Sequence, residues 1–327
     1  MESTITLFTF VLLAIVLVLA NMEHYHRAFR WITLAALVTM NLMMLLLGVA
    51  SFAFTTETAS QMGFSGDTAV AMGTFFRAMG ITGLLAFLPL IPPVRRLLAR
   101  LIPINPASVL HTAALVYAIY LAGTGIGQQP LMSNPEVMGG LGETGGVGAA
   151  TLWTQTLGMV LVAVSGVGLF TRRNLRETAQ RLGLVMPTLR QVLLGLGAIV
   201  GLFALQVAVS YLWSLFDPAG MAQIDEASNL LLGNLTGLSG AFTIGMAAAL
   251  GEEMLFRGAM LPPFRLVLTS ILFTIIHSQY ALSPATLLIL MIAVVLGLIR
   301  NRTNLTIAIL VHFGYNFLSV ILAGMGQ

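Results

Sequence analysis

Two adjacent carboxylates stand out in a long apolar part of this sequence. Residues 252 to 257 read Glu-Glu-Met-Leu-Phe-Arg, and they end an uncharged stretch that begins after Glu226. A charge at a bilayer centre costs roughly 2.5–3.5 kcal/mol on insertion scales, so such groups usually face a protein interior and have a function. On a helix, Glu253 and Arg257 share a face and can pair. Glu252 points about 100° away and is left without that partner, an arrangement suited to acid–base chemistry.

Further polar residues follow in the apolar segments closer to the C-terminus. His277 lies four residues after Phe273, so the two rings share a helix face, and His312 and Asn316 have the same spacing. Taken alone, an intramembrane His or Asn is more often a hydrogen-bonding group between helices than a catalyst. Together with the two carboxylates, they form a set whose combined chemistry is coherent.

That chemistry is the hydrolysis of an amide bond. Glu252 can take a proton from a water molecule, while a histidine orients that water. His312 and Asn316 can donate hydrogen bonds to the oxyanion that develops on the attacked carbonyl. These groups are what the reaction requires, and the sequence carries them in three separate segments.

The three motifs, in this order, resemble those of the CPBP intramembrane proteases, a family that includes the CAAX prenyl endopeptidases and the bacteriocin-processing or self-immunity proteins. The motifs are Glu252 to Arg257, Phe273 to His277, and His312 to Asn316, and the run Gly297 to Thr303 also resembles the family. The resemblance covers roughly residues 245–323.

The resemblance implies an intramembrane endopeptidase of the glutamate type. No cofactor is expected, and the substrate would be a peptide or a membrane-anchored protein, prenylated in part of the family. The resemblance assigns catalysis to Glu252, His277, His312 and Asn316, and a supporting role to Glu253, Arg257 and Phe273.

Other functions stay open at this point. Two histidines and a glutamate are a legitimate zinc set, although the compact His-Glu-x-x-His spacing is absent. A serine protease is suggested only by the short segment Gly63 to Gly66, which contains Ser65. The intramembrane acids and histidines would also suit a proton-coupled transporter, and a non-catalytic immunity scaffold could retain the same motifs.

Composition sets the class of the protein. Of the 327 residues, 57% are hydrophobic and only 8% are charged, with a mean hydropathy of +0.94. A soluble domain carries about 25% charged residues, so this is an integral membrane protein. Every basic residue is an arginine, a bias typical of a high-GC prokaryote. No nucleic-acid partner is indicated, because the arginines fall in short connections between apolar segments.

We predict an all-α, polytopic transmembrane helical bundle of about ten membrane segments. The segment at 266–280 is the weakest, since about 20 residues are needed to cross. A re-entrant piece around 258–264 would bring His277 level with Glu252. The predicted segments are 5–21, 31–54, 69–92, 107–124, 149–171, 191–214, 239–256, 266–280, 283–299 and 305–323.

The arginines predict the orientation. Fourteen of the 15 basic residues fall on alternate connections, and the connections between these contain acidic residues and no arginine. By the positive-inside rule, the arginine-bearing connections face the cytoplasm and both termini lie outside. The protein is then placed in the inner (cytoplasmic) membrane of a prokaryote, with its site towards the cytoplasmic half. The motifs divide the chain into a region at 1–190 without a recognisable motif and a protease-like core at 191–327.

Overall fold

The chain forms a bundle of helices, as its composition predicts. The computed structural model describes residues 2–53 and 55–325, and this part of the chain contains no strand. Residue 54, the end of the second predicted segment, lies outside the described residues. Helices are expected for such an apolar sequence, because in lipid each backbone N–H and C=O must form a hydrogen bond within its own segment. The all-α, polytopic fold is therefore confirmed.

The α-helices are α1 (Glu2–Met22), α2 (Ala28–Ala50), α3 (Thr56–Gln61), α4 (Gly66–Leu85), α5 (Pro92–Leu98), α6 (Val109–Met132), α7 (Pro135–Glu143), α8 (Ala149–Val167), α9 (Leu175–Leu182), α10 (Leu189–Phe216), α11 (Pro218–Leu232), α12 (Gly237–Glu252), α13 (Leu261–Ile275), α14 (Pro284–Arg302) and α15 (Leu305–Met325). A π-helix spans Glu253–Met260, and short 3₁₀ turns lie at Ser51–Ala53, Leu88–Leu90 and Ser278–Tyr280.

Nine helical stretches are long and apolar enough to cross a membrane within the described ranges, where ten apolar segments were predicted. The difference lies at Gly237–Ile275, which counts as one helical stretch but is kinked at Arg265. It joins the predicted segments at 239–256 and 266–280. The second of these provides only the short return leg of a bent hairpin, and it is too short to span on its own.

The bend in this stretch lies close to two prolines. Pro262 and Pro263 have no backbone N–H, and each proline disfavours the helical conformation of the residue before it. The helix then breaks at Arg265, whose backbone lies at φ 61° and ψ 174°. A wide π-helix precedes the break, and such helices occur most often at functional sites.

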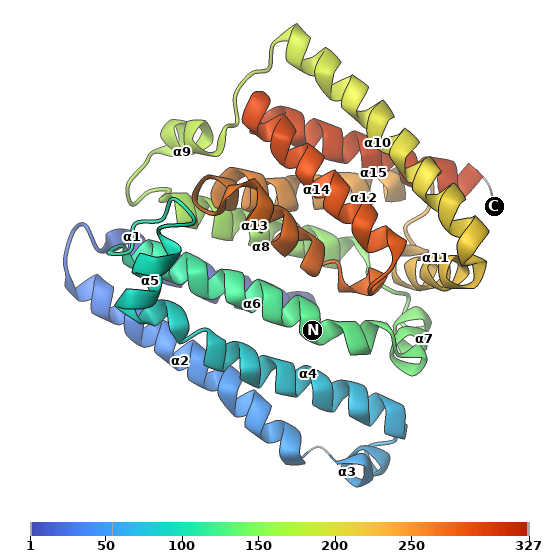
Figure 1. The fold of residues 1–327 in the computed structure, drawn as a ribbon, viewed down its shortest axis with the longest axis horizontal. Coiled ribbons are helices and arrows are strands. Elements are labelled where there is room, and N and C mark those ends of the chain that lie inside the picture. Colours follow the sequence, from blue (N-terminus) through green and yellow to red (C-terminus); the bar gives the residue numbers. More distant parts are fainter. Residues whose placement is uncertain (1, 54, 326–327) are drawn as a thin grey trace.

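The connections separate into two ends of the bundle. Figure 1 shows α5 and α9 at one end, together with the turn between α14 and α15, and α3, α7 and α11 at the other. The first end carries the arginine-rich connections, and the second carries the acidic ones. This separation is what the alternation of arginines along the sequence requires.

Helices from the first half of the chain support the hairpin. The Thr156 hydroxyl of α8 donates to the Ala247 carbonyl of α12 at 2.8 Å. Gly251 lies directly against α8, because a Cβ there would be 3.0 Å from the Thr156 Cα. On the return leg, a Cβ on Gly125 of α6 would be 2.4 Å from the Ile275 carbonyl oxygen. Helices from the two sides of residue 190 therefore pack closely against each other. The predicted division of the chain at this residue stays a prediction.

Candidate active site

The motif residues meet where four helical elements come together. Glu252 ends α12 and Glu253 begins the π-helix, His277 follows the return leg α13, and His312 lies in α15. These elements pack against one another, so residues separated by up to 60 positions in sequence share one region. The two adjacent glutamates have different partners there, as their helical positions predict.

Glu253 forms a buried ionic cluster. Its Oε1 atom accepts hydrogen bonds from Arg257 Nη1 at 2.8 Å and from His312 Nδ1 at 2.9 Å. Arg257 also donates from Nη2 to the Ala293 carbonyl of α14 at 3.2 Å. The glutamate is 0% exposed, the arginine 1% and the histidine 5%. The cluster therefore neutralises Glu253 and ties the π-helix to α14 and α15 at once.

Phe273 lies beneath this cluster and organises it. The Arg257 guanidinium lies over the Phe273 ring, with its carbon 4.1 Å from the ring centroid, a cation–π geometry. The same ring contacts His277, His312 and Phe256, with centroid separations of 4.7, 6.1 and 5.3 Å. These contacts fix the side chains of both histidines, and the supporting role of Phe273 stays a prediction.

Glu252 and His277 form a second, more open pair. The Oε2 atom of Glu252 lies 3.9 Å from His277 Nε2, and the side chains keep 15% and 19% exposure. His277 Nδ1 is 2.7 Å from the Phe273 carbonyl, which can only accept, so Nδ1 carries a proton. The Nε2 atom is then the one turned towards Glu252. Glu252 Oε2 itself is buried and has no hydrogen-bond partner within the described part of the chain.

The bend also accounts for the position of His277 beside Glu252. The bend between the π-helix and α13 brings His277 back level with Glu252, as a re-entrant piece near 258–264 predicts.

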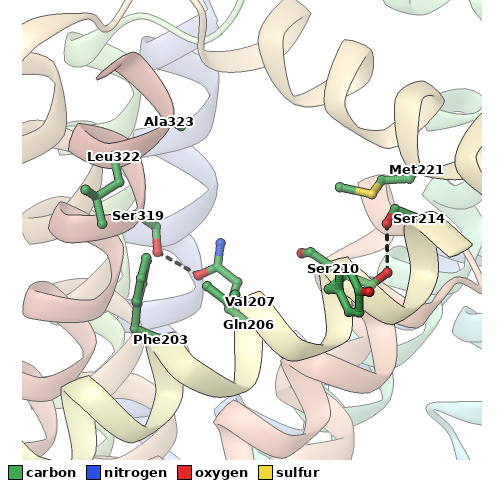
Figure 2. Close-up of a pocket in the computed structure, with 10 residues that line it drawn as sticks. Phe203, Gln206, Val207, Ser210, Ser214, Met221, Ser319, Leu322 and Ala323 are labelled. Atoms are coloured by element: carbon green, nitrogen blue, oxygen red, sulfur yellow. Dashed lines mark hydrogen bonds between the residues drawn. The ribbon is translucent and has the colours of Figure 1, made fainter. Parts of the chain in front are cut away.

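Asn316 lies one helical turn beyond His312 on α15 and is partly exposed. Its amide makes no hydrogen bond to another residue that the structure describes. Further along the same helix, the Ser319 hydroxyl donates to Gln206 Oε1 of α10 at 2.8 Å. This pair borders a largely apolar pocket of about 410 Å³ between α10, α11 and α15 (Figure 2).

Tyr280 is a neighbour of the site that sequence reasoning missed. It ends the short turn three residues after His277, and its side chain interacts with Ser228 of α11. Burial raises the pKa of the Tyr280 hydroxyl, and the negative charge of Glu252 raises that pKa further. The hydroxyl therefore stays protonated as a donor. Its spacing from His277 is the only sequence signal that could have identified it.

The residues considered for a zinc site and for a serine protease are not arranged as those sites require. Among the described residues, no three His, Cys, Asp or Glu side chains form a group that could hold a metal ion. The histidines instead face separate carboxylates, one of which is already paired with Arg257. Ser65 caps the N-terminus of α4: its hydroxyl accepts from the Thr68 N–H and donates to Glu136.

Comparison with known proteins agrees with the motifs. Residues 234–318 match the family described as type II CAAX prenyl endopeptidase Rce1-like. The resemblance found in the motifs is thereby confirmed over this part of the chain, which is similar to this family of endopeptidases. No curated protein and no solved structure matches the chain.

Proposed function

We propose that this protein is an intramembrane endopeptidase in which Glu252 activates the water that cleaves a peptide bond. The observation that carries the proposal is the division of labour between the two glutamates. Glu253 is fully buried and held by Arg257 and His312, whereas Glu252 faces His277 and keeps some exposure. A carboxylate already bound to two cationic or donor groups is a poor base, so the base is Glu252.

The separation of Glu252 and His277 suits a water molecule between them. The two facing atoms are 3.9 Å apart, too far for a direct hydrogen bond. A water that forms hydrogen bonds of about 2.8 Å to both atoms fits this separation. His277 Nε2, whose ring is fixed through Nδ1 on the Phe273 carbonyl, would hold the water while Glu252 takes its proton.

The remaining steps follow from the same groups. The hydroxide attacks the substrate carbonyl carbon, and the carbonyl oxygen becomes an oxyanion. We assign its stabilisation to Asn316 and His312 on α15. Because His312 Nδ1 donates to Glu253, His312 can donate to the oxyanion only from Nε2, and therefore only as an imidazolium. Glu252 then passes its proton to the amine nitrogen as the peptide bond breaks.

The proposed substrate is a peptide or a membrane-anchored protein, reached from within the bilayer. The apolar pocket bordered by Ser319 lies on the helix that carries His312 and Asn316, so it could receive an apolar part of such a substrate (Figure 2). The arginine-bearing end of the bundle is proposed to face the cytoplasm of a prokaryotic cell. No cofactor is required by this mechanism, and zinc dependence is tested below.

Purified protein in detergent tests the activity itself. Membrane proteins from the host are incubated with the wild type or with Glu252→Gln, and new C-termini are identified by mass spectrometry. We expect a defined set of cleavages that only the wild type produces. The proposal is wrong if both proteins give the same products. If the wild type then carries a proton-coupled flux in proteoliposomes, the protein is a transporter.

A further inference from the structure

A second cavity lies away from the glutamates, at the arginine-bearing end of the bundle. It has a volume of about 410 Å³ and lies between the connection that follows α1 and the connection from α8 to α9. The side chains that define its chemistry are His24, Tyr25, Phe170, Arg172, Arg173 and Glu177. None of them belongs to the proposed catalytic set.

The cavity has an excess of positive charge. Its one carboxylate, Glu177, is used locally, because it accepts the Asn174 N–H at 2.9 Å in a capping box at the start of α9. The two arginines form no ion pair with a carboxylate in the described part of the chain. His24 adds an imidazole at the rim. Two guanidinium groups against one carboxylate leave a net positive charge, which favours an anion.

Both arginines are positioned by the backbone. Arg172 donates from Nε to the Asn21 carbonyl at 3.1 Å, and Arg173 donates from Nη1 to the Val167 carbonyl. A guanidinium has five N–H donors in a rigid plane, so one bond fixes each group while further donors remain for a ligand. Oxygen atoms of a phosphate match this fork in a bidentate manner.

The loop that carries the arginines is held in a costly conformation. Phe170 lies at φ 58°, a region that side chains with a Cβ rarely adopt. Its N–H donates to the Arg173 carbonyl at 2.8 Å, and the Tyr25 hydroxyl donates to the Thr171 carbonyl at 2.6 Å. Phe170 is 76% exposed and Tyr25 is 64% exposed. Backbone strain that presents an exposed aromatic ring beside two cations indicates a functional role.

We propose that this cavity binds the headgroup of an anionic phospholipid. The phosphodiester would lie on Arg172 and Arg173, and Phe170 and Tyr25 would lie at the level of the headgroups and upper acyl chains, where aromatic residues gather in membrane proteins. A zwitterionic lipid suits the site less well, because its ammonium group would meet the same cations. The proposal concerns a site separate from the peptidase chemistry and does not depend on it.

The test measures lipid retention on the full-length protein purified in detergent. Native mass spectrometry follows the binding of added phosphatidylglycerol, phosphatidylcholine or inorganic phosphate to each variant. For the wild type we expect one tightly held phosphatidylglycerol, weaker phosphatidylcholine and no competition by inorganic phosphate at similar concentration. The variant Arg172→Gln/Arg173→Gln should bind phosphatidylglycerol roughly tenfold less tightly or worse, since it loses charge-assisted hydrogen bonds.

A matched control removes the same charge from the two helices that follow this connection, α9 and α10. Arg176 and Arg190 are exposed and do not line the cavity, so Arg176→Gln/Arg190→Gln should retain the lipid like the wild type. A second variant guards against misfolding: Phe170→Gly suits the positive φ, so it should fold at least as well and still hold the lipid less tightly. The proposal is wrong if the cavity variants retain the lipid, if the control loses it equally, or if inorganic phosphate displaces it.

Discussion

His312 and Glu253 are joined by a buried hydrogen bond of 2.9 Å between Nδ1 and Oε1, although 59 positions separate them in sequence. The bond links the last transmembrane helix to the π-helix that follows Glu252. Through this bond, His312 also stabilises the fold, in addition to its proposed role in stabilising the oxyanion. Asn316, one turn away on the same helix, has no such bond among the described residues.

This difference predicts distinct effects for two neighbouring substitutions. His312→Ala removes a hydrogen bond to a charged group, which contributes roughly 1.5–3 kcal/mol, so both thermal stability and cleavage should fall. Asn316→Ala should lower the cleavage rate while the melting temperature in detergent stays near that of the wild type. If Asn316→Ala destabilises the protein as much as His312→Ala does, the amide has a structural role.

Arg257 gives a stability prediction. It is buried, it pairs with Glu253 and it lies over Phe273, so Arg257→Ala leaves a buried carboxylate without its cation. Breaking a buried pair in this way costs roughly 3–5 kcal/mol. Denaturation in detergent should show this loss together with the loss of activity. A variant that is both fully stable and fully active would contradict the assignment.

Glu136 gives a pH prediction at the other end of the bundle. Hydrogen bonds from the Ser65 and Thr68 hydroxyls lower the pKa of its carboxyl below the ordinary 4.5. Because the pKa of Glu136 is lower in the folded than in the unfolded protein, the ionised carboxylate stabilises the contact between α7 and α4 at pH values above the unfolded-state pKa. This stabilisation is lost as the pH falls through the folded-state pKa. The protection of backbone amides at the start of α4, measured as the exchange rate relative to its intrinsic value at each pH, should therefore fall below about pH 4.5. In Glu136→Gln this protection should already be lower at neutral pH and should not change in that range.

Orientation is tested by labelling, because the chain contains no cysteine. Gly140 in α7 and Arg176 in α9 lie at opposite ends of the bundle, and a side chain at Gly140 meets nothing within 4 Å. With intact cells and an impermeant maleimide, Gly140→Cys should react and Arg176→Cys should not. The reverse pattern would place the arginine-bearing end outside.

The sequence predicted the partners of the two glutamates for a simple reason. Adjacent helical positions point about 100° apart, so only Glu253 could reach Arg257. The bend at Arg265 could not be predicted from the sequence, because hydropathy describes polarity and does not identify a single residue with a positive φ. For this reason the predicted segment at 266–280 is only the short leg of a hairpin. The bond from His312 to Glu253 depends on how α15 packs, which no local pattern encodes.

The most direct test of the central claim compares Glu252→Gln with Glu253→Gln on one identified substrate. Glu252→Gln keeps the shape of the side chain and should leave detergent stability near that of the wild type. Its cleavage rate should fall by at least about 10²-fold, the usual lower size of a general-base contribution. Glu253→Gln should be destabilised, because it disturbs the cluster with Arg257 and His312. A chelator should not change the wild-type rate. The account is contradicted if Glu252→Gln cleaves at a near-normal rate, or if a chelator abolishes activity and zinc restores it.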